Sequence, residues 1–354
     1  MIVFKTVLRN SKRNIISILG ISLAYVVSLI IIIYVNDQLS IDKSQSNYKK
    51  IYRLERGTWA LLPGGVIPWV EEQYPEVVSH ARIGGTYWES MIDYQNEFHT
   101  IERVLFVDGK PFDVFDYNFI YGDAETALDA PNAVVLTNEL SRRIFGDENP
   151  MGKLLNYNDQ FPVQVTAVIE ERSDIHLRFD MLIKFEMLKD VLALKTDQFM
   201  TRLSGSQNYM GYMVLNTDDP DALVEKINSN LIEIGAYDTD NNPPNYIFRP
   251  FKNIYFSNDA VTEFGVVHGN FQTVIAMIFI ALFILIIATI NYVNVANAKG
   301  ITRAREVGLR KLLGCSRKSL ILQFISESVF ISLISFILAI LFILILYNPF
   351  QTAL

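Results

Sequence analysis

The stretch "TRAREVGLRKLLGCSRKSL", residues 302–320, is strongly basic and lies between two long apolar runs. A third apolar run lies near the N-terminus. Each run lacks Lys and Arg and is about 20 residues or longer, which at about 1.5 Å per helical residue crosses a hydrocarbon core of about 30 Å. We therefore predict three transmembrane helices, at residues 14–35, 271–297 and 319–347.

The first apolar run also has the positively charged flank of a secretory signal peptide. Its apolar stretch is longer than the hydrophobic region of such a peptide, and no small-x-small cleavage site follows it. We therefore interpret residues 14–35 as a retained membrane anchor.

Charge predicts the orientation of these helices. Residues 1–13 contain four basic residues and no acidic one, and residues 299–318 contain seven basic residues against the single acid Glu306. Short segments rich in Lys and Arg stay in the cytoplasm. We therefore predict a multi-pass protein of the inner (cytoplasmic) membrane, with a cytoplasmic N-terminus at 1–13, a cytoplasmic loop at 298–318 and an extracytoplasmic region at 36–270.

The predicted extracytoplasmic region is acidic, with 36 acidic and 20 basic residues and a net charge of −16. Such a surface repels phosphate groups, so we expect no nucleic-acid partner. The single cysteine, Cys315, lies in the cytoplasmic loop, so the extracytoplasmic region forms no disulfide and depends on its own apolar core.

Strand and helix patterns alternate along this region and predict an α+β fold. Strands are predicted from β-rich apolar runs at 102–107, 132–137, 161–170, 181–185, 209–217 and 246–251. Helices are predicted at 137–145, with Thr137 as N-cap, and at 218–234, with Asp219 as N-cap and Pro220 in the first turn. The sequence pattern changes near Ser173, which suggests a small α+β unit inserted into a larger one.

No catalytic or metal site is predicted. The four histidines, His80, His99, His176 and His268, have no ligand spacing. The stretch "GDENPMGKL", residues 146–154, has five residues between its glycines and Leu154 where a phosphate loop needs Ser or Thr. Asp108, Asp113 and Asp116 lack the pattern of a calcium loop, so we interpret them as turn formers and solvated charges.

The basic loop has more structure than its charge requires. On a helical wheel Leu309, Leu312 and Leu313 share one side, and Glu306 precedes Arg310 by four residues in the favourable order for an ion pair. Gly314 is a natural helix stop and Ser316 can cap the next helix. We predict a short helix, a turn and then the third transmembrane helix.

Glu327 is the ionisable residue within the third apolar run. Charges inside membranes often serve function. Glu327 also lies close enough to the cytoplasmic end to reach lipid headgroups or a basic loop residue, and both interpretations stay open.

The basic loop resembles the R-x-x-E-[IV]-G-[IL]-R-[KR]-x-x-G-[AC] signature of FtsX-like and MacB-like ABC transporter permeases. The matching residues are Arg303, Glu306, Val307, Gly308, Arg310, Lys311, Gly314 and, downstream, Gln323 and Glu327. A second stretch, "VDGKPFDVFDYNFIYGDAETALDAPNAVVLTNELSRRIFGDENPMGKLL", is similar to the periplasmic core domain of this family, and residues 8–43 are similar to its first helix.

The resemblance implies a mixed α/β extracytoplasmic domain of MacB type between the first and second helices. Its two subdomains would cover residues 48–171 plus 246–260, and an inserted part at 172–245. Such permeases have at least a fourth helix, so we expect the chain to be an N-terminal piece of a longer permease whose end, 348–354, is extracytoplasmic and truncated.

The resemblance also implies a division of labour. A separate cytoplasmic ABC ATPase would bind and hydrolyse ATP, and this chain would be neither an enzyme nor a cofactor-binding protein. The loop helix would dock on the ATPase through Arg303, Glu306, Val307, Leu309, Arg310 and Lys311, and motion would pass along the membrane helices to the extracytoplasmic domain (mechanotransmission).

The implied transport function is efflux or extraction of a peptide, an antibiotic or a lipoprotein. The implied partners are the lipid bilayer, a second copy or pseudo-copy in a dimer, and an extracytoplasmic adaptor or substrate protein. An alternative is a membrane-anchored sensor or scaffold that binds an envelope ligand without an ATPase, but that reading leaves the loop helix without a purpose.

Overall fold

A computed structural model describes residues 11–86, 88–194 and 198–351 of the 354-residue chain. Within these ranges the side chains of 11–14, 16, 298–306, 310 and 346–351 are not described. The chain divides into two compact units, one of long helices and one comprising Ser40–Gly269, and each is described by itself. The second unit is called the ectodomain below.

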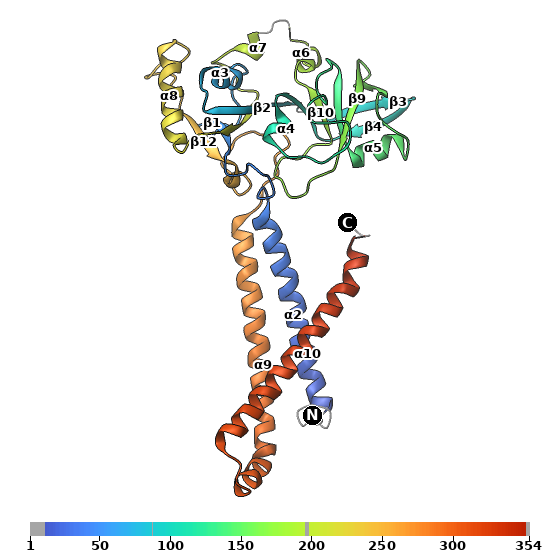
Figure 1. Cartoon of the computed structure of the whole chain (residues 1–354), viewed down its shortest axis with the longest axis vertical. Coiled ribbons are helices and arrows are strands. Elements are labelled where there is room, and N and C mark those ends of the chain that lie inside the picture. Colours follow the sequence, from blue (N-terminus) through green and yellow to red (C-terminus); the bar gives the residue numbers. More distant parts are fainter. Residues whose placement is uncertain (1–10, 87, 195–197, 352–354) are drawn as a thin grey trace. The chain divides into compact units, whose positions relative to one another are not determined.

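The first unit consists of long helices (Figure 1). They are α2 (Ser11–Ser40), α9 (Phe271–Leu312) and α10 (Arg317–Gln351). Each contains a window long and apolar enough to cross a membrane, at Ser17–Ser40, Phe271–Asn297 and Arg317–Ile345. The prediction of three membrane-spanning helices is confirmed.

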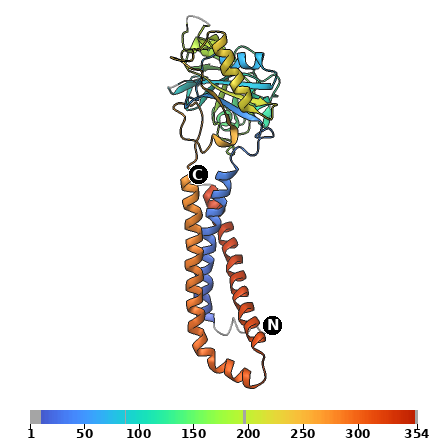
Figure 2. The same ribbon diagram turned by 90° about the vertical axis from the view of Figure 1, so that its left-hand side faces the viewer.

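Residues 298–312 do not form a separate loop helix, contrary to the prediction. They continue α9, because no proline interrupts the sequence between Phe271 and Leu312. Figure 2 shows that the helix changes direction in its C-terminal part. Residues 298–312 are therefore part of the same helix as the second membrane-spanning segment.

Serines of α10 face the other two helices of this unit. The Tyr25 hydroxyl in α2 lies 2.6 Å from Ser332 Oγ, and Ser335 Oγ donates to the Ile18 carbonyl at 3.2 Å. The Tyr292 hydroxyl in α9 donates to Ser328 Oγ at 2.8 Å. Small hydroxyl residues of this kind are common where membrane helices pack closely.

The ectodomain is built on one mixed sheet of twelve strands among the described residues, in the order β12-β1-β11-β2-β5-β10-β7-β9-β8-β3-β4, with β6 paired to β9. The strands are β1 (Ile51–Arg56), β2 (Val77–Gly85), β3 (Ser90–Tyr94), β4 (Glu97–Ile101), β5 (Val104–Gly109), β6 (Phe119–Tyr121), β7 (Ala133–Thr137), β8 (Leu154–Tyr157), β9 (Phe161–Ile169), β10 (Met181–Lys184), β11 (Met210–Leu215) and β12 (Tyr246–Pro250). The β5–β10 and β7–β9 pairs are parallel and the other pairs are antiparallel.

Short helices pack around this sheet. They are α3 (Val66–Gln73), α4 (Pro111–Val114), α5 (Asn138–Phe145), α6 (Met187–Val191), α7 (Gln198–Thr201), α8 (Pro220–Glu233) and the 3₁₀ turn η1 (Phe251–Asn253). Both faces of the sheet centre are buried: in β5, Val104 and Phe106 belong to one apolar cluster, and Leu105 and Val107 to another. Because side chains alternate along a strand, a continuous apolar run marks a strand covered on both faces.

The predicted caps of two helices are present. Thr137 Oγ1 accepts from Leu140 N at the start of α5, and Asp219 accepts from Ala222 N at the start of α8. The apolar stripe of α8 is buried at Leu223, Ile227 and Leu231, as expected for core packing. Ile234, three residues further along, lies just past the helix and is half exposed.

The sheet runs through both predicted subdomains. Strand β10 lies between β5 and β7, and β11 lies between β1 and β2, although both come from the range 172–245. The chain after Ser173 therefore returns its strands to the interior of the sheet, and strand pairing gives no boundary at residue 172 or residue 245.

Candidate functional site

The C-terminal part of α9 presents exposed leucines. The apolar window of α9 ends at Asn297, and the helix runs on to Leu312. At about 1.5 Å per residue this 42-residue helix is about 63 Å long, twice the thickness of a hydrocarbon core. In the extension, Leu309, Leu312 and Leu313 are 60%, 87% and 84% exposed. We call these three residues the leucine face.

The other predicted contact residues lie on the same helical segment. Val307 is half-buried and Lys311 is exposed. Arg303, Glu306 and Arg310 have helical backbone, but their side chains lie outside the described residues. The ion pair between Glu306 and Arg310 therefore stays a prediction.

Gly314 and Ser316 shape the turn between α9 and α10. Gly314 has φ 88°, a left-handed conformation that glycine adopts without strain, and its N–H donates to the Lys311 carbonyl at 3.1 Å. Ser316 Oγ accepts from Ser319 N at 3.3 Å in the first turn of α10. The turn holds Cys315 exposed beside the leucine face.

Glu327 lies in α10 and is only 7% exposed. Its neighbour Ser328 accepts the hydroxyl of Tyr292 from α9. The side chain is thus enclosed within the helical unit, and the two interpretations left open for its role both remain predictions.

The histidines and carboxylates singled out in the sequence separate into different pairs. His80 Nδ1 lies 2.7 Å from Glu71, Asp108 pairs with Arg82, and Asp116 accepts from Ser46 N at 2.6 Å. Asp108 and Asp113 also line a cavity of about 530 Å³. Among the described residues no three His, Cys, Asp or Glu side chains are grouped so as to hold a metal ion.

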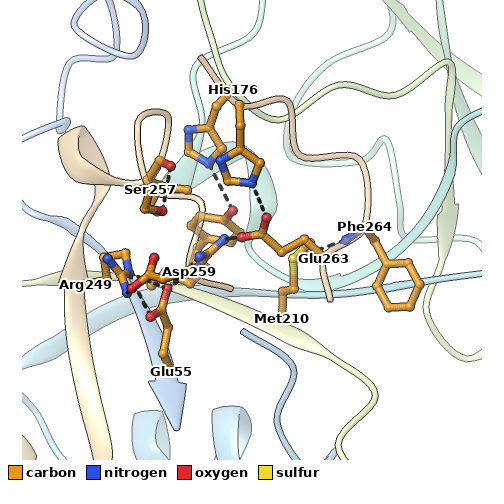
Figure 3. Close-up of polar contacts among 12 residues, drawn as sticks. Glu55, His176, Met210, Arg249, Ser257, Asp259, Glu263 and Phe264 are labelled. Carbon is orange, nitrogen blue, oxygen red and sulfur yellow. Dashed lines mark hydrogen bonds and ion pairs between the residues drawn. The ribbon is translucent and has the colours of Figure 1, made fainter. Parts of the chain in front are cut away.

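A buried cluster of charges that the sequence gave no reason to expect lies at one end of the sheet (Figure 3). Arg53 and Glu55 of β1 are fully buried, and Arg53 Nε donates to Glu55 at 2.8 Å. Arg53 also pairs with Glu263, which pairs in turn with His268. Arg249 of β12 lies opposite Arg53 in the strand register and donates to both Glu55 oxygens at 2.8 Å.

These partners balance one another electrostatically. Although burial by itself lowers the pKa of Arg53, the adjacent Tyr212, Glu55 and Glu263 raise that pKa overall. The hydrogen bond to Glu263 raises the pKa of His268. Burial alone raises the pKa of Glu263, but His268 and Arg53 lower it overall. The cluster is therefore a paired ionic core rather than an isolated buried charge.

Comparisons with known proteins agree on the two parts of the chain. Residues 15–230 match the family described as MacB-like periplasmic core domain, and residues 278–353 match the FtsX-like permease C-terminal family. A curated relative is the "Macrolide export ATP-binding/permease protein MacB" of Campylobacter jejuni, 24% identical over 228 residues. That match covers 62% of this chain and 32% of the relative, so the chain aligns with about a third of the relative's length.

Solved structures of extracytoplasmic domains are also similar. The periplasmic region of MacB from Actinobacillus actinomycetemcomitans has a TM-score of 0.43 and 14% identity, over 63% of this chain and 96% of that one. The extracellular domain of the ABC-type transporter YknZ from Gram-positive bacteria has a TM-score of 0.41 and 15% identity, over 56% of this chain and 98% of that one.

Proposed function

Because this chain belongs to the family of MacB- and FtsX-like ABC transporter permeases, we propose that it transmits the ATP-driven motion of a partner ABC ATPase to its ectodomain. The chain itself does not hydrolyse ATP in this proposal. The observation that carries it is the exposed leucine face at the end of α9.

The leucine face is a surface that needs a partner. Three leucines at 60–87% exposure lie beyond the apolar window of the span, where we expect the helix to have left the hydrocarbon. Contiguous apolar surface of this kind marks an interaction site. Basic residues border it, including the exposed Lys311, so the partner surface combines an apolar groove with acidic groups.

The helical continuity of α9 supports a mechanical role. One unbroken helix joins the leucine face to the first residues after the ectodomain, from Leu312 to Phe271. A continuous helix has a fixed rise per residue, so a displacement of residues 298–312 is passed along α9 even though the helix changes direction there (Figure 2). The excess of basic residues supports a cytoplasmic location for the leucine face and for the N-terminus.

The name of the curated relative suggests the substrate class. We propose efflux or extraction of a macrolide-like antibiotic, a peptide or a lipoprotein, handled by the ectodomain. Pairing of two such chains, with an extracytoplasmic adaptor or substrate protein on the ectodomain, completes the proposed assembly in the inner membrane.

Co-purification tests the docking role. The expected partner is an ABC ATPase with a G-x-x-x-x-G-K-[ST] loop, and the reading frames that neighbour this chain are the first place to seek it. The double variant Leu309→Asp with Arg310→Glu should lose that ATPase while remaining folded in the membrane. A matched control is Leu154→Asp, which places the same substitution at a 62% exposed leucine of the ectodomain and should retain it.

The opposite result would contradict a docking role for the leucine face. If the double variant retained the ATPase as well as the wild type and the Leu154→Asp control do, the leucine face would have no part in docking.

A further inference from the structure

His176 lies in the loop between β9 and β10 and is fully buried. Its backbone N–H donates to Asp42 Oδ1 at 2.9 Å, and its ring Nδ1 lies 2.8 Å from Asp42 Oδ2. Asp42 N donates in turn to the Asp174 carbonyl at 2.7 Å. Asp42 is itself fully buried, in a left-handed conformation with φ 71°, two residues after α2 ends at Ser40.

The same loop holds the chain that leads to α9. The Val267 N–H donates to the His176 carbonyl at 2.9 Å, Leu177 and Val266 form a β-bridge, and Arg178 N donates to the Gly265 carbonyl at 2.6 Å. Val267 precedes the first residue of α9 by four positions. We call residues 41–50 the first connector and residues 254–269 the second connector. His176 is bonded to both.

The second ring nitrogen reaches the sheet. Nε2 of His176, which Figure 3 labels, lies 3.0 Å from the hydroxyl of Tyr212 in β11. The carboxylate of Asp42 can only accept, so Nδ1 is the donor there, and Nε2 of a neutral imidazole then accepts from the Tyr212 O–H. Burial raises the pKa of Tyr212, which keeps this hydroxyl protonated and able to donate.

Ion pairs also join the sheet to the second connector. Arg53 of β1 pairs with Glu263, which pairs with His268. Glu263 and His268 both belong to the second connector. Buried polar contacts therefore join Asp42 of the first connector to β11, and a separate set joins β1 to the second connector.

An Asp–His–hydroxyl chain of this kind also resembles the proton relay of hydrolases. Asp42, His176 and Tyr212 are each 0% exposed, so no substrate can reach the Tyr212 oxygen. The geometry serves to fix chain segments in place rather than to catalyse a reaction.

We propose that His176 is a positioning residue that locks the two connectors to each other and to the sheet, so that α2 and α9 act on the ectodomain together. This inference deepens the proposed function and rests on it. A buried carboxylate that loses its partner is strongly destabilised, so we expect loss of the His176 side chain to loosen the connectors.

Spin-label distances in the full chain test this lock. Cysteines replace the exposed Lys43 and the 43% exposed Val267, one on each connector, in a Cys315→Ser background. The chain is reconstituted in lipid nanodiscs, and double electron–electron resonance gives the distance distribution between the labels. We expect one narrow distribution with His176 and a broadened one with His176→Ala.

His176→Asn provides the matched rescue, because its amide nitrogen takes the place of Nδ1 and restores the bond to Asp42. Tyr212→Phe removes only the hydroxyl and keeps the packing. We expect His176→Asn to narrow the distribution again. In complex with the ATPase, stimulated hydrolysis should fall by about tenfold in His176→Ala and recover in His176→Asn.

The outcomes separate the two proposals. If the distribution stays narrow in both His176→Ala and Tyr212→Phe, the lock is refuted even where the ATPase binds and is stimulated. The lock is also refuted if His176→Asn restores thermal stability but neither the distance nor the stimulation. If the wild-type chain binds no ATPase, the proposed function fails, while the distances without nucleotide still decide whether the lock exists.

Discussion

The C-terminal end of α9 and the charge cluster of the ectodomain use polar and apolar residues in opposite ways. The leucine face exposes apolar side chains, whereas the ectodomain encloses Arg53 and Glu55 completely. Each arrangement costs free energy in isolation, through exposed apolar surface in one case and desolvated charge in the other. The first indicates a partner outside this chain, and the second indicates that the partners are already present within it.

The largest expected effect tests the enclosed region. Arg53→Met leaves Glu55 and Glu263 buried without their common partner, so we expect the free energy of unfolding to fall by about 3–5 kcal/mol. Denaturant titration of the ectodomain signal in the full chain measures it. Arg103→Met is the control, because Arg103 in the Arg103–Asp180 pair is 44% exposed and its loss should cost about 1 kcal/mol or less. Equal effects of the two substitutions would contradict the ionic core.

A smaller effect tests the exposed region. A Cβ at Gly308 would meet no atom of this chain within 4 Å, so Gly308→Ala should preserve the fold. Against a closely packed ATPase the added methyl costs about 1–3 kcal/mol, so we expect affinity for the ATPase to fall by about tenfold.

The matched control for that variant is Gly20→Ala in α2, where an added Cβ likewise meets nothing within 4 Å. Binding isotherms of the two variants should differ. Unchanged affinity for Gly308→Ala would mean that no partner approaches this side of the helix closely.

Helix capping gives an effect of intermediate size within the ectodomain. Asp219→Ala removes the acceptor for Ala222 N at the start of α8, and we expect stability to fall by about 1 kcal/mol. Asp218→Ala, at the exposed neighbouring position, should change stability much less. If only Asp218→Ala shifted the denaturation midpoint, Asp219 would not be the residue that caps α8.

The smallest expected effect is a pH dependence of the charge cluster. The pKa of His268 is raised in the folded state, so its contribution to stability is complete below its unfolded pKa and is lost as pH rises through the folded value. The pKa of Glu263 is lowered, so its contribution is present above its unfolded pKa and is lost only as pH falls through the folded value.

We therefore expect the melting temperature to decline from slightly acidic pH toward alkaline pH. His268→Gln should flatten that decline, which thermal scans across the pH range would detect. A wild-type slope retained in the variant would exclude His268 as its source.

Much of the architecture follows from local sequence signals. Apolar length alone predicts the three membrane-spanning helices, and Thr137 and Asp219 mark helix starts through their own side chains. The continuity of α9 through residues 298–312 was missed because a charged segment after an apolar one was interpreted as a break. No proline and no glycine cap ends the helix near residue 298.

The parts that were missed depend on distant pairing or on unusual turns. Strands β3 and β4 meet at Gln95 and Asn96, which both have positive φ without the Asn-Gly signal of such turns. Arg53 and Glu263 are 210 residues apart, and Asp42 and His176 are 134 apart. The local sequence around these residues does not show that they pair, because each charged residue by itself is typical of a solvated surface.

Labelling of Cys315, the only cysteine of the chain, tests the central claim most directly. Cys315 is exposed beside the leucine face, on the side where the ATPase should dock. A membrane-impermeant maleimide should leave intact cells unlabelled and label inside-out vesicles, and bound ATPase should slow that labelling. Labelling in intact cells would place the leucine face outside the cytoplasm and contradict the proposed coupling to an ATPase.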